Sequence, residues 1–208
     1  MPQKKELLLI FTRNLEIGRV KKRLAKKVGN TAALEVYRYL LKHTQEITKD
    51  LDCDKTVYYS EEIPTNDLWE EKEYQKMIQL GKDLGERMEN AFKRAFSEGY
   101  SKVVIIGSDL FDLQEKDLKK AFLALQEKNY VLGPAQDGGY YLLGMTKMNS
   151  KVFRNKDWST PAVFEQTLND LKEENVALLE VRNDIDTFED MRQHQVLLEL
   201  VDNLKERS

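Results

Sequence analysis

The stretch VVIIGSD, residues 103–109, decides the fold class of this chain. Its four consecutive β-branched residues have no polar interruption, which is typical of a strand buried on both faces of a parallel sheet. The run ends in Gly107, Ser108 and Asp109. Open α/β sheets bind ligands at the carboxyl ends of their strands. Asp109 is therefore a candidate ligand for a divalent metal ion, and the alternative is an ordinary turn-forming aspartate.

Other apolar runs alternate with helical patterns along the whole chain, which predicts an α/β fold with a mostly parallel sheet. Further strands are expected at residues 7–11, 56–59, 76–80, 130–134, 142–145 and 176–181. Helices are expected at residues 31–49, 88–96 and 118–125, and from residues 161 and 187 onward. Several polar residues are predicted to cap these helices. They are Asn30 or Thr31, Asp112 with Glu115, Thr160, and Thr187 with Asp190.

Composition excludes several classes of protein. The chain has 208 residues, 41% of them hydrophobic, and a formal net charge of -3. These values are expected for one globular domain, or one with an appended lobe, without a nucleic-acid-binding surface. No apolar run approaches the roughly 18 residues of a membrane span. The N-terminus leads into a predicted strand without a cleavable signal pattern, so we expect a cytoplasmic protein. One cysteine and two distant histidines do not form a metal-binding cluster.

A concentrated positive charge follows the first predicted strand. Between residues 12 and 27, one acid stands against seven basic residues: Arg13, Arg19, Lys21, Lys22, Arg23, Lys26 and Lys27. On a slightly acidic protein, this pattern indicates a local anion such as phosphate, which the backbone could approach closely at Gly18. The alternative is a solvated basic helical turn without a ligand. Neither glycine-rich nucleotide fingerprint is present, which disfavours P-loop NTPases and dinucleotide dehydrogenases.

Two further segments combine glycines with charged residues. Gly81 and Gly85 precede a predicted helix and could admit a phosphorylated or planar ligand at its N-terminus, or could simply form a capped turn. The sequence DGGY, residues 137–140, lies between two predicted strands. It is either a hairpin-like turn or a place where the backbone approaches a ligand. Asp184 and Asp186 lie on one side of an extended segment and could face the same pocket.

Six ordered motifs together resemble the DUF2064 family, whose members are identified as candidate glycosyltransferases with the GT-A nucleotide-diphospho-sugar transferase fold. The motifs lie at residues 11–24 (FTRNLEIGRVKKRL), 79–88 (QLGKDLGERM), 106–109 (IGSD), 133–144 (GPAQDGGYYLLG), 158–160 (WST) and 184–190 (DIDTFED). They cover most of the chain. Departures from the family include Lys22 in place of a threonine, the absence of a proline after Asp109, and Leu15 and Ile17 in place of loop prolines, which leaves the first loop less rigid.

The resemblance implies a single Rossmann-like domain over residues 1–208, with a nucleotide-binding half at about 1–112 and an acceptor half at about 113–208. It implies that Asp109 binds a Mg²⁺ or Mn²⁺ ion. The nucleotide-binding residues would be Arg13, Gly18, Lys21, Arg23, Gln79, Gly81, Asp83 and Arg87. The acceptor-side residues would be Gly138, Gly139, Tyr140, Trp158, Ser159, Thr160, Asp184 and Asp186.

Three functions are compatible with these residues. The leading hypothesis is metal-assisted transfer of a sugar from a nucleotide-diphospho-sugar to an unknown small-molecule acceptor, with Lys21 and Asp137 as the catalytic residues. The alternative is a nucleotidyltransferase that joins a nucleoside triphosphate to a phosphorylated acceptor. Its first loop usually carries several glycines, whereas this loop has only Gly18. A third hypothesis is a nucleotide-binding protein without turnover, since fold alone does not fix function.

Overall fold

The computed structural model describes residues 6–206 and contains one seven-stranded sheet. The strands are β1 (Glu6–Thr12), β2 (Asp54–Tyr59), β3 (Gln75–Ile78), β4 (Lys102–Ile106), β5 (Tyr130–Pro134), β6 (Tyr140–Met145) and β7 (Val176–Leu178). Their order across the sheet is β3-β2-β1-β4-β6-β5-β7. Every pair is parallel except the two that involve β6. The predicted α/β fold with a mostly parallel sheet is confirmed.

Two strands end earlier than predicted. β3 ends at Ile78, and β7 ends at Leu178, followed by an isolated bridge between Ala135 and Arg182. Both are edge strands, which pair on one side only. The residues after each strand end lie at the carboxyl edge of the sheet, where a site can form.

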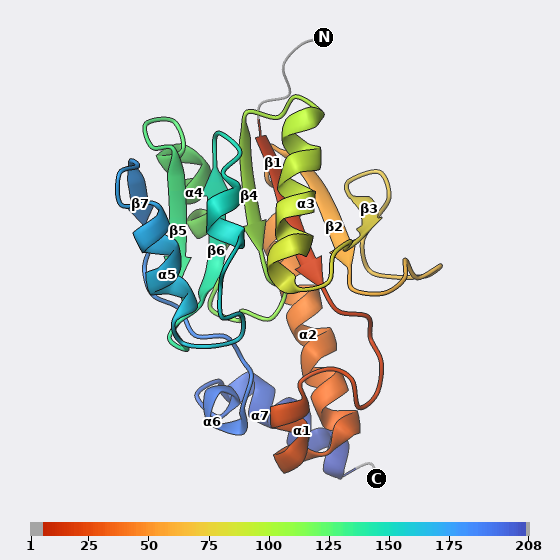
Figure 1. Ribbon diagram of the computed structural model, residues 1–208. Coiled ribbons are helices and arrows are strands. Elements are labelled where there is room, and N and C mark those ends of the chain that lie inside the picture. The colour runs from red at the N-terminus through yellow and green to blue at the C-terminus, as the bar shows by residue number, and fades with distance from the viewer. Residues whose placement is uncertain (1–5, 207–208) are drawn as a thin grey trace.

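Helices pack on both faces and below the carboxyl edge of the sheet (Figure 1). They are α1 (Lys22–Val28), α2 (Asn30–Thr48), α3 (Leu84–Ser97), α4 (Glu115–Ala124), the 3₁₀ helix η1 (Ser150–Phe153), α5 (Val163–Asp170), α6 (Phe188–Met191) and α7 (Gln195–Lys205). Part of the basic segment is thus helical, as α1. Whether the segment binds an anion stays a prediction. α3 begins four residues earlier than its apolar pattern indicated.

Three of the predicted helix caps are wrong, and one is confirmed. Gly29 precedes α2, so neither Asn30 nor Thr31 caps it. The cap of α4 is Gln114, whose N–H donates to the Asp117 carboxylate. α5 begins after Ala162 rather than after Thr160. Thr187 and Asp190 do form a capping box at the start of α6. Polar residues are common near helix starts, so sequence alone places a cap less well than it places the helix.

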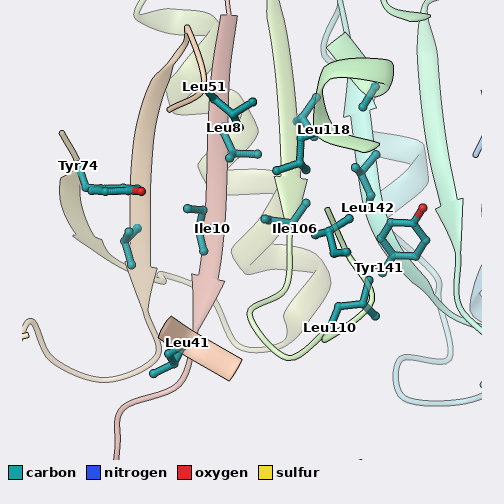
Figure 2. Close-up of a cluster of buried hydrophobic side chains, with 14 of the residues drawn as sticks. Leu8, Ile10, Leu41, Leu51, Tyr74, Ile106, Leu110, Leu118, Tyr141 and Leu142 are labelled. Carbon is teal, nitrogen blue, oxygen red and sulfur yellow. The ribbon is translucent and has the colours of Figure 1, made fainter. Parts of the chain in front are cut away.

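The core consists of two layers on the sheet and a third cluster below it. Alternate residues of the central strands enter opposite layers: Leu8 and Ile10 face α2 and α4, whereas Leu7 and Leu9 face α3. Figure 2 shows the first layer, with Leu118 of α4 close to the strands. The third cluster joins α1, α2, α6 and α7. Figure 1 places these helical segments beyond the arrowhead of β1, so the carboxyl edge of the sheet faces them.

Among residues 6–206, the structure has no helix long and apolar enough to cross a membrane. The division into a nucleotide half and an acceptor half stays a prediction. Sheet pairing crosses the proposed boundary, because β4 pairs with β6.

Candidate functional site

A pocket of about 690 Å³ lies at the carboxyl ends of β1, β2 and β4. Its wall consists of the first loop and α1, the segment after β2, the start of α3, and the residues that follow β4. Several predicted site residues line it: Arg13, Lys21, Arg23, Gln79, Asp83, Arg87, Asp109, Ser159 and Asp186. Segments far apart in the sequence therefore meet at one place, as expected for an open α/β sheet.

An ion pair between Lys21 and Asp109 lies in this pocket. Lys21 Nζ is 2.9 Å from Asp109 Oδ2, and the lysine side chain is only 4% exposed, whereas that of Asp109 is 40% exposed. Burial opposes the charge on both groups, but each stabilises the other: the pKa of Lys21 is raised and that of Asp109 is lowered. Both groups are therefore charged at neutral pH.

The segment that precedes α6 brings further carboxylates to the pair. Asp186 accepts a hydrogen bond from Arg23 Nη1 at 2.9 Å and lies 4.0 Å from Lys21 Nζ. Burial and then the negative charge of Asp109 raise the pKa of Asp184 to about 6. Asp184 can therefore exchange a proton close to neutral pH. Asp186 lines the pocket and Asp184 does not.

Tyr37 on α2 fixes the ends of β1 and β4, a role that no sequence pattern predicts. Its hydroxyl accepts a hydrogen bond from the backbone N–H of Arg13 at 2.9 Å. The same oxygen lies 3.1 Å from Thr12 Oγ1 and 3.0 Å from Ser108 Oγ. One buried phenol thus joins both strands immediately before Arg13 and Asp109. A tyrosine at a helical core position looks like ordinary packing, so only the assembled fold discloses this role.

Gln79 and Arg87 form another part of the pocket wall, and both side chains donate hydrogen bonds to backbone carbonyl oxygens. Gln79 Nε2 donates to the carbonyl oxygens of Thr12 (3.0 Å) and Tyr58 (2.9 Å). Arg87 Nε donates to the Gly81 carbonyl oxygen at 3.1 Å. The amide of Gln79 therefore ties the ends of β1 and β2 together. Because its N–H groups are used in these hydrogen bonds, a ligand would have to contact other atoms of the pocket wall.

Gly81 and Asp83 each have a structural role in the turn before α3. Gly81 has φ +149°, and a Cβ there would lie 2.7 Å from Arg87 N. Asp83 precedes α3 and accepts a hydrogen bond from Glu86 N at 2.8 Å. Asp83 lines the pocket and Gly81 does not. The capped-turn alternative for this segment therefore holds, while a contact with a nucleotide stays a prediction.

In the described part of the chain, some cations of the first loop and α1 are in ion pairs with acids, and others are not. Arg19 is paired with Glu16 and Glu61. Within residues 6–206, neither the Arg13 guanidinium nor the Lys22 ammonium has an ion-pair partner, and both residues are exposed and line the pocket. Gly18 has φ +77° and lies outside the lining. Arg13 and Lys22 are therefore the cations that an incoming anion can neutralise without breaking an existing ion pair.

The turn between β5 and β6 lies outside the pocket lining. It is a hairpin turn, in which Asp137 accepts a hydrogen bond from Gly139 N at 2.9 Å. Gly138 has φ +88°, and a Cβ there would lie 2.3 Å from the Pro161 carbonyl oxygen. The close approach that requires glycine is thus made to the chain itself. An additional contact of Asp137, Gly138 or Gly139 with an acceptor stays a prediction.

The segment WST, residues 158–160, reaches the pocket only through Ser159. Trp158 packs against Gly85, where a Cβ would lie 2.5 Å from the indole Nε1. Thr160 Oγ1 donates to the Asp157 carbonyl oxygen. Tyr140 packs in the second core layer. Contacts at Gly85 and Gly138 therefore hold this segment in place, with Ser159 at the pocket in a left-handed conformation, φ 66°.

The pocket offers carboxylate oxygens to a hard divalent cation, but among residues 6–206 too few for a complete set of ligands. Asp109 and Asp186 flank the Lys21 ammonium, so their oxygens already accept a cation between them. Within the part of the chain that the structure describes, no three His, Cys, Asp or Glu residues are close enough to hold a metal by themselves. A Mg²⁺ or Mn²⁺ ion would therefore need oxygen ligands from a substrate, which a diphosphate can supply.

Comparison with known proteins adds a family to this geometry. Residues 43–160 match the family model described as an uncharacterized protein conserved in bacteria, DUF2064. The chain belongs to the DUF2064 family. The resemblance found in the sequence is thereby confirmed. No curated protein matches the chain significantly.

Solved structures support the fold of this DUF2064 protein. A provisionally assigned nucleotide-diphospho-sugar transferase from Desulfovibrio desulfuricans G20 is 31% identical, with a TM-score of 0.84, and the match covers 95% of this chain and 97% of that one. A 4-diphosphocytidyl-2C-methyl-D-erythritol synthase from Anaerococcus prevotii DSM 20548 is 11% identical, with a TM-score of 0.57 and coverages of 94% and 99%. Rv0371c from Mycobacterium tuberculosis H37Rv, in complex with manganese, is 14% identical, with a TM-score of 0.53 and coverages of 93% and 98%.

Tyr37→Phe removes the hydroxyl that joins the two strand ends. We expect it to lower the free energy of unfolding by about 1–3 kcal/mol, because buried groups lose their partner. Tyr39→Phe is the control on the same helix, since its hydroxyl makes no hydrogen bond among residues 6–206. Urea unfolding of both variants measures the difference, and equal effects would contradict the bridging role of Tyr37.

Gly138→Ala separates packing from backbone strain. Gly99→Ala is the matched control, because Gly99 has nearly the same φ, +89°, but nothing within 4 Å of its added Cβ. Left-handed strain alone costs about 1–2 kcal/mol. The clash with Pro161 should add about 1–3 kcal/mol at Gly138, as overpacking does. Equal losses of unfolding free energy in the two variants would contradict this, because they would show that the chain at Pro161 moves away from the added methyl group at little cost.

The raised pKa of Asp184 predicts a pH dependence of stability. Its folded pKa of about 6 lies above the ordinary value of 3.8, so the native state binds this proton more tightly than the unfolded chain does. The resulting stabilisation is complete below about pH 4 and is lost as the pH rises through 6. Between pH 4 and pH 7 in EDTA, the native protein should therefore lose more unfolding free energy than Asp184→Asn. Parallel pH profiles would refute this assignment.

Proposed function

We propose that this protein is a transferase that binds a nucleotide-diphospho-sugar in the pocket and transfers the sugar to a small-molecule acceptor, assisted by Mg²⁺ or Mn²⁺. The observation that carries the proposal is the arrangement of charges at the carboxyl edge of the sheet. Arg13 and Lys22 line the pocket without ion-pair partners in the described chain, and the partly exposed Asp109 lines the same pocket. Cations for phosphate and a carboxylate for metal are the two requirements of diphosphate binding.

The family relationship supports transferase chemistry. The D. desulfuricans protein, named as a nucleotide-diphospho-sugar transferase by provisional assignment, matches nearly the whole chain at 31% identity. Relatives with lower identity share the fold only, and they include a cytidylyl-type synthase. We favour sugar transfer over nucleotidyl transfer because the first loop has one glycine, Gly18, where nucleotidyltransferases of this fold usually carry several.

In this proposal, the diphosphate lies against the first loop and α1. Arg13, Lys22 and Arg23 would neutralise its oxygens, and the wall formed by Gln79 and Arg87 would face the base or ribose. Asp109, with Asp186 beside it, would hold the metal ion, which stabilises the charge that develops on the leaving diphosphate. Lys21 would contribute positive charge at the same place.

The acceptor would approach from the side of Asp137, Asp184 and Ser159. A base on this side would remove the proton from the acceptor hydroxyl as that oxygen attacks the sugar. Asp137 is exposed, and its negative charge contributes to the raised pKa of Asp184. The two carboxylates are thus electrostatically coupled. We assign the role of the base to Asp137. Asp184 would be a second carboxylate that could take up the proton.

Phosphate binding is tested by the double variant Arg13→Gln with Lys22→Gln. It should weaken binding of nucleoside diphosphates by about 2–4 kcal/mol, through loss of two charge-assisted contacts. Lys26→Gln with Lys27→Gln is the control, because these lysines belong to the same basic segment but do not line the pocket. Calorimetry with GDP, UDP, CDP and ADP measures the effect. Equal affinity in the two double variants would refute the assigned diphosphate position.

The metal role of Asp109 is tested by Asp109→Asn, which keeps the side-chain volume. In the native protein, Mn²⁺ should increase the affinity for a nucleoside diphosphate, and in the variant this increase should disappear. An undiminished metal effect would move the ligand role to another carboxylate. The reaction type is read from the products: sugar transfer releases a nucleoside diphosphate from a nucleotide-sugar, whereas nucleotidyl transfer releases pyrophosphate from a nucleoside triphosphate.

A further inference from the structure

Lys21 has an unusual position for a lysine. Its backbone is left-handed, with φ 46° and ψ 46°, immediately before α1. A residue with a Cβ adopts this conformation only at a steric cost. Its side chain is 4% exposed and ends beside carboxylates, 2.9 Å from Asp109 Oδ2 and 4.0 Å from Asp186 Oδ1. Contacts of the ammonium with these acids offset the cost of strain and burial.

This ammonium already uses one oxygen, Oδ2, of the carboxylate that a metal ion at Asp109 would bind. Hard divalent cations bind carboxylate oxygens, and the exposed side of Asp109 opens into the pocket. Two cations that share one carboxylate repel each other strongly where water is scarce. The Asp109 carboxylate therefore cannot serve both at full strength.

We propose that Lys21 is a resident counterion of Asp109 that a divalent metal ion displaces. The step is an exchange of non-covalent partners: the Lys21–Asp109 ion pair breaks, a metal–Asp109 contact forms, and the ammonium turns into the pocket toward the phosphates. This inference rests on the proposed function, because it takes Asp109 as the metal ligand. It adds that the lysine and the metal compete for one carboxylate.

The exchange has a consequence for the order of binding. Without a substrate, the metal must displace a buried ammonium that then lacks a full partner, so metal alone should bind weakly. A diphosphate offers oxygens to the metal and to the released Lys21 together. Metal and diphosphate should therefore strengthen each other's binding, and by thermodynamic linkage the factor is the same for both.

Amine labelling of the folded native protein tests the displacement directly. Brief acetylation followed by peptide mass spectrometry, with and without Mg²⁺ and inorganic pyrophosphate, reports the exposure of each lysine. Lys156 is the matched control, because its side chain is 2% exposed and paired with Asp170, among residues outside the pocket lining. We expect Mg²⁺, at a concentration high enough to bind without pyrophosphate, to increase labelling of Lys21 several-fold and to leave Lys156 unchanged. Unchanged Lys21 labelling at a Mg²⁺ concentration that binds the protein would overturn the proposal.

The variant Lys21→Met tests the competition. Mn²⁺ binding without nucleotide, measured by electron paramagnetic resonance, should become at least tenfold tighter than in the native protein, while the exposed control Lys22→Met should change it far less. Equal or weaker Mn²⁺ affinity in folded Lys21→Met would overturn the exchange and leave the metal role of Asp109 intact. No Mn²⁺ binding in any of the three proteins, even with pyrophosphate, would overturn the exchange together with the metal part of the proposed function.

Discussion

The ion pair between Lys21 and Asp109 is the interaction on which the organisation of the site depends. It spans 88 residues of sequence and joins the start of α1 to the end of β4. Asp186 extends the pair to the C-terminal segment through Arg23, across 163 residues. A buried ammonium without its carboxylate would carry a large desolvation penalty, so α1, β4 and the segment before α6 are held in one arrangement.

Hydrogen bonds to the strand ends hold this arrangement in place. Tyr37 joins the ends of β1 and β4, and Gln79 joins the ends of β1 and β2. Both use side-chain atoms to satisfy polar groups at the carboxyl edge of the sheet, where the backbone ladder stops. The candidate site residues Arg13 and Asp109 therefore start from fixed backbone positions. Fixed backbone positions of this kind preorganise the charges that the side chains carry.

Much of the fold could be predicted from the sequence because its strands are short β-branched or aliphatic runs. The run at 103–106 became β4 at the centre of the sheet, between β1 and β6. Local pattern could not show that β6 runs antiparallel, since its hydrophobic run would suit either direction. α1 was harder to predict, because five of the residues between 21 and 27 are lysine or arginine and a charged run also suits an exposed loop.

The candidate site could be predicted in outline, by charge and motif, but not in its contacts. Arg13, Asp109 and Asp186 do meet in one pocket. The burial of Lys21 and the bridging role of Tyr37 depend on tertiary packing and have no local signature. Gly138 shows the opposite problem: its motif suited either a hairpin turn or an approach to a ligand, and the atoms nearest to an added Cβ belong to Pro161. A glycine indicates that some group approaches the backbone closely, but it does not show whether that group belongs to a ligand or to the chain itself.

A crystal structure grown with Mn²⁺ and a nucleoside diphosphate tests the central claim, that the pocket at the carboxyl edge of the sheet binds the diphosphate group, most directly. We predict phosphate oxygens within hydrogen-bonding distance of Arg13 and Lys22, and a Mn²⁺ ion bound to Asp109 and to the diphosphate. A nucleotide bound elsewhere on the protein, or a diphosphate in this pocket that contacts neither cation, would contradict the account.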